Sequence, residues 1–349
     1  MLPVQLPNRP LLLSTRFTVP ANTVRGPSDD YALVPAFDEP LFLDEIRFNY
    51  ISQTAGTRPE NDVRVELTMG GSIQFTNNPV PLAALNTSPQ PYNFTTGPVG
   101  IGFPGDYIPE NGVTFRLPKP LYLNATNFVD KLVPKIHNNT STAITMTISY
   151  ACRRAQKGII PNEIWYPYLA NYRTPSFVLS NTSQPFLYES SPNDLINPFS
   201  VPLLVDRLVG FIGTDTPQPV LLDYKNRSYV GELINCRLLD TNGRPVVRDL
   251  TPFNALSNLQ NNAWQARGVL RPHEYYIAQI SYDNGVASTL FTNIPPPPTT
   301  TANIVLIASR RADSVYANRP LDDLDIPQQP GRPAVAKIFT NMPAILKGN

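Results

Sequence analysis

The chain has 349 residues with 39 prolines, only 16% charged side chains and a formal net charge of +1. Since no run of like charge occurs, the composition does not favour electrostatic steering toward nucleic acid, and no apolar run approaches the ~20 residues that span a bilayer as a helix. At roughly 100–200 residues per domain, this length suits two domains better than one.

Residues 1–11 are expected to form an extended N-terminal arm. Pro3, Pro7 and Pro10 fall within the first ten residues and disfavour a helix there, while they favour extended or polyproline conformations. The stretch also lacks the basic start of a secretory signal peptide. We therefore expect no signal peptide and synthesis in the cytoplasm.

The first domain is expected at residues 12–155 and opens with a series of strands. Leu12–Val19 is predicted as the first strand, and Leu41–Ile51 mixes apolar with polar residues as in a strand with one wet face. Val63–Leu67 and Ile73–Phe75 alternate more strictly and flank a Gly-Gly pair. This turn chemistry predicts a hairpin.

A short helix is plausible after the hairpin of each half, at Leu82–Leu85 and at Phe253–Leu259. Residues 86–112 then form the longest irregular stretch of the first half, rich in proline and glycine. Loops of this length within a compact domain are usually functional or lie at an interface. The second half carries its main insertion elsewhere, near Asp223–Ser228. The two halves are therefore expected to present different loops on one scaffold.

Segments of the first half recur in the second half in the same order. Pro40–Asp44 recurs as Pro202–Asp206, and the run Thr142–Ala155, which ends in Arg-Arg-Ala, recurs as Thr301–Ala312. Further matched pairs are Phe17 with Phe177–Leu179, Pro81–Leu85 with Pro252–Leu256, and Leu117–Leu123 with Arg271–Ile277. A single domain-sized repeat differs from the periods of about 20–50 residues that mark solenoids. We therefore predict a tandem duplication in which the two copies share one fold.

The second domain is expected at residues 176–312 and repeats the hairpin of the first. Leu233–Leu238 and Pro245–Val247 are short apolar runs that flank a turn. Asn242 and Gly243 lie within that turn, and both residue types tolerate positive φ.

The segments outside the two domains differ in composition. Residues 156–175 are too aromatic for a flexible linker, and we expect this inter-domain connector to pack Trp165, Tyr166 and Tyr168 against one or both domains. Residues 313–349 carry five prolines and no strand-length alternation, which predicts a C-terminal arm.

The residue types that carry catalysis or bind metals do not cluster in the sequence. His137 and His273 fall at non-equivalent positions of the two copies, without Cys, His or carboxylate partners at metal-ligand spacing. Asp44 and Asp206 are equivalent, but an aspartate beside a strand usually caps a turn or forms an ion pair. There is no nucleophile-elbow, phosphate-loop or dinucleotide motif. We therefore predict no catalytic, cofactor-binding or metal-binding residue, and a protein that is not an enzyme.

Three other features have ordinary structural interpretations. Asp322–Asp325 offers oxygen ligands for calcium but lacks the turn glycine and closing glutamate of an EF-hand loop, so we expect a solvated acidic segment. Arg153–Arg154 and Arg310–Arg311 could contact phosphate, but pairing with carboxylates or capping a sheet edge is the expected role. Cys152 and Cys236 lie on non-equivalent strands and are expected as buried thiols rather than a disulfide.

Seven or eight short strands in each half predict an all-β chain. A parallel sheet would need intervening helices, so a tandem duplicated antiparallel β-sandwich, or double jelly roll, with short helices and extended terminal arms fits best. This architecture resembles the double jelly-roll major capsid proteins of tailless icosahedral double-stranded DNA viruses, a lineage that includes adenoviruses and membrane-containing phages. The resemblance covers residues 12–312 and is carried by the duplication, the helices after the hairpins, the unequal loops and the arms.

The resemblance implies a structural protein of the virion, made in the host cytoplasm. In that family two jelly rolls stand side by side, three chains form a pseudo-hexagonal trimer, and the arms lie toward an internal membrane or adjacent capsomers. The implied partners are a homotrimer, neighbouring capsomers, minor capsid or vertex proteins and an internal viral membrane, without cofactors and without sequence-specific nucleic-acid binding. This chain departs from the pattern by lacking an evident basic or amphipathic N-terminal helix for membrane contact.

An alternative interpretation is a phage tail or fibre receptor-binding protein, or a carbohydrate-binding tandem β-sandwich. Such a protein would also be β-rich and weakly charged, but it is expected to repeat an aromatic platform with a carboxylate at equivalent loops. The aromatic residues here cluster in predicted strands and in the connector. A polysaccharide hydrolase would need two carboxylates on facing strands, and the sequence does not indicate such a pair.

Overall fold

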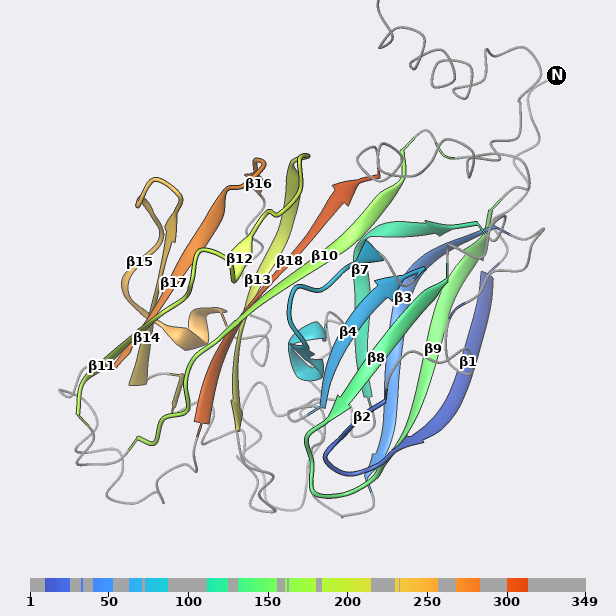
Figure 1. Ribbon diagram of the computed structural model, residues 1–349, viewed down its shortest axis with the longest axis horizontal. Helices are drawn as coiled ribbons and strands as arrows, with labels where there is room; N and C mark the ends of the chain where they lie inside the picture. Colours follow the sequence, from blue (N-terminus) through green and yellow to red (C-terminus); the bar gives the residue numbers. More distant parts are fainter. Residues whose placement is uncertain are drawn as a thin grey trace, which may run out of the picture.

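The computed structural model describes residues 10–25, 33, 40–52, 63–70, 73–86, 112–124, 131–155, 161, 163–179, 184–214, 230–231, 233–256, 268–282 and 300–312. These residues form two β-sandwiches that lie beside each other along the longest axis of the molecule (Figure 1). The expected all-β tandem architecture is confirmed.

The first sandwich contains the strands of residues 10–154. Its strands are β1 (Pro10–Val19), β2 (Thr23–Arg25), β3 (Leu41–Ser52), β4 (Val63–Met69), β5 (Ile73–Gln74), β6 (Val80–Pro81), β7 (Gly112–Leu123), β8 (Leu132–Asn138) and β9 (Ile144–Arg154). One sheet has the order β1-β9-β3-β7 and the other the order β2-β8-β4-β5, with β6 also paired to β4. Every strand pair in these sheets is antiparallel.

The second sandwich repeats this arrangement. Its strands are β10 (Trp165–Arg173), β11 (Phe186–Glu189), β12 (Leu195–Ile196), β13 (Leu203–Thr214), β14 (Ile234–Asp240), β15 (Pro245–Pro252), β16 (Gly268–Leu270), β17 (Tyr275–Tyr282) and β18 (Thr300–Arg311). The sheets have the orders β10-β18-β13-β16 and β11-β17-β14-β15, with β12 also paired to β17. The two sandwiches therefore share one strand order, that of a jelly roll, and the predicted duplication is confirmed. The match of Leu117–Leu123 with Arg271–Ile277 is wrong, because the pairing of Leu123 with Leu41 and of Leu270 with Leu203 makes the end of β7 equivalent to the end of β16.

The hairpins and short helices form where the turn chemistry places them. Gly70 after β4 has φ +59° and Gly243 after β14 has φ +74°, the left-handed region that glycine enters without steric cost. After each hairpin the chain makes a single 3₁₀ turn, η2 (Leu82–Leu85) in the first sandwich and η4 (Phe253–Leu256) in the second. Both helices expected from the sequence are thus present, η4 ending before Leu259.

Two β-bulges establish which residues of the two sandwiches are equivalent. The pairing register shifts at Asp44 in β3 and at Asp206 in β13, so each aspartate is the extra residue of a bulge. The match of Pro40–Asp44 with Pro202–Asp206 is confirmed by this geometry.

The same bulges correct the alignment of the two Arg-Arg pairs. Immediately before the bulges, Leu43 pairs with Cys152 and Val205 pairs with Ala308. Cys152 and Ala308 are therefore equivalent, and the residues two positions after them, Arg154 and Arg310, are equivalent as well. The sequence match instead aligns Arg153 with Arg310. The difference matters because a shift of one residue places a side chain on the opposite face of the sheet.

The start of the second sandwich also differs from the sequence expectation. Within the expected connector, residues 156–175, the segment Trp165–Arg173 is strand β10, which pairs along its whole length with β18. β10 is therefore the counterpart of β1, and Phe177–Leu179 is not; Phe177 forms an isolated bridge to Thr300. Similarly, β1 begins at Pro10, inside the expected arm. β10 escapes pattern recognition because seven successive residues are buried, which removes the alternation of a half-exposed strand.

Candidate functional surfaces

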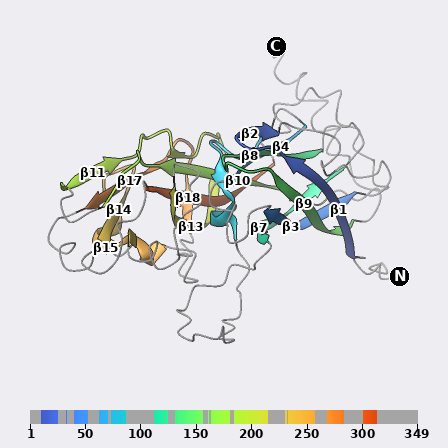
Figure 2. The ribbon, with the colours of Figure 1, turned by 90° about the horizontal axis from the view of Figure 1, so that it is seen from below.

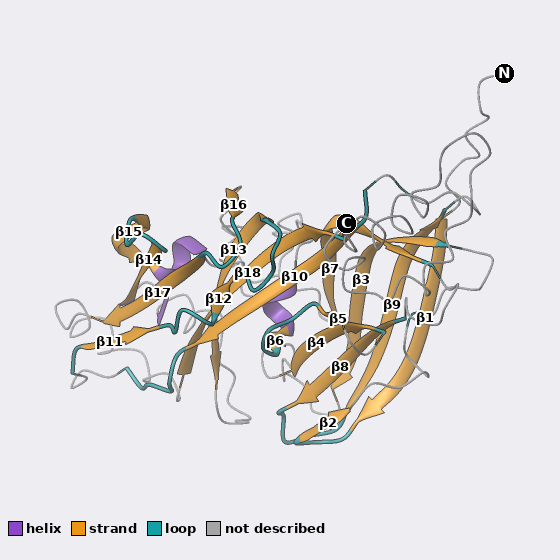
Figure 3. Cartoon of the chain, turned by 45° about the horizontal axis from the view of Figure 1, so that its top comes forward, coloured by secondary structure: helices purple, strands orange, loops and turns teal. Residues whose placement is uncertain are grey.

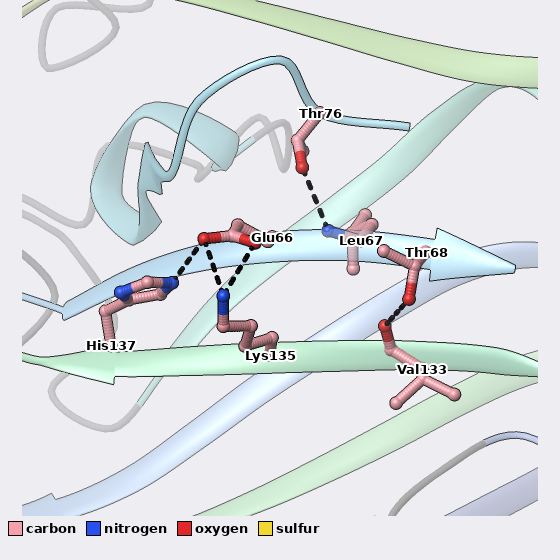
Figure 4. A network of polar contacts seen from close by, with 7 residues as sticks. All are labelled: Glu66, Leu67, Thr68, Thr76, Val133, Lys135 and His137. Carbon is pink, nitrogen blue, oxygen red and sulfur yellow. Dashed lines mark hydrogen bonds and ion pairs between the residues drawn. The ribbon is translucent and has the colours of Figure 1, made fainter. Parts of the chain in front are cut away.

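A polar cluster on the first sandwich joins β4 to β8 (Figure 4). Glu66 lies opposite Lys135 in the register, and Lys135 Nζ is 3.2 and 3.3 Å from its two carboxylate oxygens. His137 Nε2 lies 2.6 Å from Glu66 Oε1. Burial lowers the pKa of His137 below 6.5 despite the opposing effect of Glu66, so at neutral pH the uncharged ring donates to the carboxylate. The cluster is a satisfied cross-strand network.

His273 lies in the other sandwich, in the turn before β17. Its φ is +64°, and its backbone N–H donates to Asn197 O at 3.0 Å. The two histidines therefore do not come together. Within the part of the chain that the structure describes, no group of three or more His, Cys, Asp or Glu side chains is arranged to hold a metal ion.

The two equivalent aspartates form ion pairs at their bulges. Arg153 donates from Nε and Nη2 to the two oxygens of Asp44 at 2.6 and 2.7 Å. Arg207 Nε donates to Asp206 Oδ2 at 2.8 Å. The bulge turns each aspartate toward its arginine, which is the ordinary role expected from the sequence.

The second Arg-Arg pair places its members in different surroundings. Arg311 Nη2 donates to Glu163 Oε1 at 2.5 Å near the surface, the carboxylate pairing expected for these arginines. Arg310 is buried, with its guanidinium 3.8 Å from the ring centroid of Phe199 and 5.5 Å from that of Tyr166. Burial lowers the pKa of Arg310 to about 10, which leaves it charged at neutral pH. Arg310 therefore packs against aromatic rings in the interior and is not accessible to a phosphate group.

The two cysteines are buried free thiols, as expected. Burial raises the pKa of Cys152 to about 12, with a further contribution from nearby Asp44. Burial also raises the pKa of Cys236. A protonated, enclosed thiol is a poor nucleophile, so neither cysteine is placed for covalent chemistry.

Several segments noted in the sequence lie outside the described residues. These are the acidic segment Asp322–Asp325, the insertion Asp223–Ser228, the arms at 1–9 and 313–349, and the irregular stretch at 87–111. Of the residues that the structure describes, none belongs to a helix long and apolar enough to cross a membrane.

The two sandwiches share a hydrophobic core across one face of the β10-β18-β13-β16 sheet. Val209 and Phe211 of β13 and Val305 and Ile307 of β18 pack into the core of the first sandwich. The first sandwich covers this face with η2, whose four residues are buried (Figure 3). The opposite face of the same sheet packs on the core of the second sandwich. Strands β10 and β18 of this sheet are therefore enclosed on both faces.

Backbone hydrogen bonds close this junction beside its apolar part. Leu169 N donates to Phe75 O at 2.7 Å, and Asn77 N donates to Leu169 O at 3.0 Å, so that Thr76 and Leu169 form a parallel bridge. Asn171 N donates to Asn77 Oδ1 at 2.9 Å. The outer edge of β10, which runs between the two halves (Figure 2), thus takes a segment of the first sandwich as its neighbour.

Sequence reasoning did not identify this junction, although a signal was present. Ile304–Ala308 is a continuous apolar run, whereas Ile144–Cys152 alternates apolar residues with threonine and serine over its first half. Continuous runs are typical of strands buried on both faces. Of the three aromatic residues expected to pack, Tyr166 lies in the first core and Tyr168 in the second, whereas Trp165 is partly exposed and belongs to neither core.

The equivalent face of the first sandwich, the outer face of β1-β9-β3-β7, is polar and only partly exposed, since Arg47 is exposed while Glu45 and Ser149 are buried. At the positions equivalent to Val209 and Val305 it carries Arg47 and Ser149. Leu12 on β1 is 59% exposed. The other exposed large apolar residues among those described are Val24 on β2, Val178, Leu187 on β11 and Val269 on β16. The four strands that carry these exposed residues, β1, β2, β11 and β16, are all at sheet edges.

Comparison with known proteins finds similarity only at the level of structure. No protein-family model matches the sequence, and no curated protein matches it. Three similar solved structures are the STIV MCP (11% identity, 86% of this chain and 96% of that chain, TM-score 0.46), the structure of Sulfolobus Turreted Icosahedral Virus (12%, 92% and 96%, 0.44), and the major capsid protein P2 from Bacteriophage PM2 (9%, 85% and 98%, 0.38). The resemblance expected from the sequence is thus also found among solved structures, while the fold itself follows from the strand order above.

Proposed function

We propose that this chain is a structural protein, the major capsid protein of a tailless icosahedral virus. The observation that carries the proposal is the jelly-roll strand order, present twice in one chain and joined through a shared core. The result is one elongated block that has exposed sheet edges and one polar sheet face that no second sandwich of the same chain covers. Open edges put an isolated chain at risk of non-specific association, and closed symmetric assembly removes that risk.

Three such blocks form a pseudo-hexagonal homotrimer. Because the two sandwiches share one fold, three chains present six similar sides, and a head-to-tail contact closes into a ring when its rotation fits. Each contact between chains is expected to bury more than ~2,000 Å², the range of permanent interfaces.

The two sandwiches and the terminal arms have different roles in the shell. The sandwiches form the wall of the trimer, and the arms, 1–9 and 313–349, reach neighbouring capsomers, minor capsid or vertex proteins, or an internal membrane. The protein then resides in the virion. The second jelly roll begins with β10, so the connecting segment ends before Trp165.

A non-enzymatic role is supported by what the chemistry-bearing residues do. Glu66, Asp44 and Asp206 each hold a basic side chain in an ion pair. The carbohydrate-binding alternative is not favoured, because the exposed large apolar side chains among the described residues are all aliphatic and offer no aromatic platform for a sugar ring.

Sedimentation of the full-length chain tests the trimer. We expect a stable species of three times the 38.7 kDa chain mass at micromolar concentration. A chain that stays monomeric at high concentration would contradict the proposal.

Removal of residues 313–349 tests the role of the C-terminal arm. The truncated chain should still form trimers, because the sandwiches are intact, but it should not assemble into shells under conditions in which the full chain does, as seen by electron microscopy. Normal shells from the truncated chain would show that this arm is dispensable for contacts between trimers.

A further inference from the structure

The register of the strands makes Leu12 the counterpart of Leu169. Leu12 of β1 pairs with Ala151 of β9, and Leu169 of β10 pairs with Ile307 of β18. Ala151 and Ile307 are each the first partner after the bulge of the neighbouring strand, so the two positions are equivalent. Yet Leu169 is fully buried under the first sandwich, whereas Leu12 is 59% exposed.

The segment that covers Leu169 also has a counterpart in the second sandwich. The strand pairings before and after this segment match those of the second hairpin. Before it, Gln74 pairs with Thr68, as Pro245 pairs with Leu239 in the second sandwich. After it, Val80 pairs with Val65, as Thr251 pairs with Cys236. The two intervening stretches have the same length, and η2 and η4 follow at the same distance. Phe75–Asn77 is therefore equivalent to Val246–Arg248.

We propose that, in the trimer, the outer edge of β1 around Leu12 binds Val246–Arg248 of a second copy of this chain. The contact repeats between chains the one that Leu169 and Phe75–Asn77 make within a chain. The inference rests on the proposed homotrimer and assigns the two surfaces that form it. β1 and β15 are both edge strands, and they lie at opposite ends of the longest axis (Figure 1), so the contact joins chains head to tail.

The different chemistry of the two equivalent sheet faces agrees with this assignment. The face covered within the chain carries Val209 and Val305. At the same positions the other face carries the exposed Arg47 and Ser149, a buried polar residue that bonds to Ser14. A face that is never exposed can be apolar. A face that stays in water until a second chain arrives must remain soluble, since large exposed apolar patches promote aggregation. Leu12 is then the apolar anchor at the edge of a polar surface.

Two exposed leucines on edge strands provide a matched test. Leu12→Lys places a charge on the edge of β1, a substitution that blocks edge pairing. Leu187→Lys does the same on β11, where the side chain is 61% exposed. β11 is the counterpart of β2, and the backbone hydrogen bonds described above for the junction join β10 to Phe75 and Asn77 rather than to β2. Sedimentation should show trimer association weakened by about tenfold or more for Leu12→Lys and unchanged for Leu187→Lys.

Disulfide trapping provides a test that does not depend on weakening the contact. Ser14 is equivalent to Asn171 and Arg248 to Asn77, two residues that touch within the chain. The double variant Ser14→Cys, Arg248→Cys should therefore cross-link chains into covalent dimers and trimers on mild oxidation. Ser14→Cys combined with Leu187→Cys should not.

The outcomes separate this inference from the proposed trimer. The native thiols Cys152 and Cys236 are buried, so cross-links report the introduced cysteines. If the wild type is a trimer, the Leu12→Lys variant is an equally stable trimer and the double-cysteine variant gives no cross-link, the assignment of surfaces is overturned and the trimer itself is not. A wild-type chain that remains monomeric would overturn the trimer itself.

Discussion

Asn138 is a fully buried amide at the end of β8 that holds three chain segments together. Its Nδ2 donates to the carbonyls of Val19, Pro20 and Thr142 at 3.2, 2.9 and 3.0 Å. Its Oδ1 accepts from the backbone and hydroxyl of Thr140 at 3.0 and 2.7 Å. Nothing in the sequence marks it out from its neighbour Asn139, because the difference arises from where the strand places each side chain.

Replacing Asn138 by aspartate tests the role of its donors. Asn138→Asp keeps the size and the acceptor oxygen but removes the NH₂ group, so buried carbonyls lose their partner and face a carboxylate. We expect the free energy of unfolding at neutral pH to fall by about 2–4 kcal/mol, measured by urea denaturation. Asn139→Asp at the exposed neighbour is the control. Equal effects of the two substitutions would contradict this account.

His137 predicts a pH dependence of stability. Its folded-state pKa is lowered by burial, so the unfolded chain binds the proton more readily. The contribution is fully present above the unfolded value of 6.5 and is lost as pH falls through the folded pKa. Unfolding free energies between pH 8 and pH 5 should therefore decline less in His137→Gln than in the wild type. Glu66→Gln should steepen the decline, because Glu66 raises the pKa of His137; identical profiles would refute the assignment.

Strands β9 and β18 show how equivalent elements diverge according to what covers them. β18 is buried from Thr300 to Arg310, whereas β9 alternates between buried and partly exposed positions over its first half. Val305 and Ser149 occupy equivalent places, and Ser149 Oγ accepts a part-buried hydrogen bond from Ser14 Oγ at 2.8 Å. The sequence of each strand thus differs according to whether another sandwich packs on its outer face.

Reciprocal substitutions test this asymmetry. Val305→Ser puts an unpaired hydroxyl and a small cavity into the junction and should lower the free energy of unfolding by about 2–4 kcal/mol. Ser149→Val removes a single part-buried hydrogen bond, the one with Ser14, and should cost at most about 1 kcal/mol. Chemical denaturation of both variants measures the difference. A similar cost for the two changes would mean that the junction contributes little.

Elements built on local chemistry are predictable from the sequence, and those set by tertiary contacts are not. The hairpin glycines Gly70 and Gly243 mark their turns because few other residues adopt positive φ freely. β10 was missed because it is enclosed on both sides and contains Pro167, so no alternation remains. The register of the Arg-Arg pairs depends on the bulges at Asp44 and Asp206, and an extra residue in a strand has no sequence signature of its own.

At the scale of the whole molecule, the shared core makes the two sandwiches one thermodynamic unit. Residues of β13 and β18 contribute to the core of the first sandwich as well as to their own. We therefore expect a single calorimetric unfolding transition for the chain, with equal calorimetric and van't Hoff enthalpies. Two separate transitions would show that the sandwiches unfold independently. Neither the shared core nor the single unfolding transition can be predicted from the sequence duplication, which is equally compatible with two independent domains.

The bridge between Leu169 and Thr76 also has a kinetic consequence. Because both residues belong to one chain, this contact forms at an effective concentration set by the tether, of the order of millimolar, and does not depend on how much protein is present. In the proposed ring, three of the six contacts between sandwiches are therefore already made before any two chains meet. Ring closure requires three encounters in place of six, and the covalent connection compels the two kinds of sandwich to alternate around it.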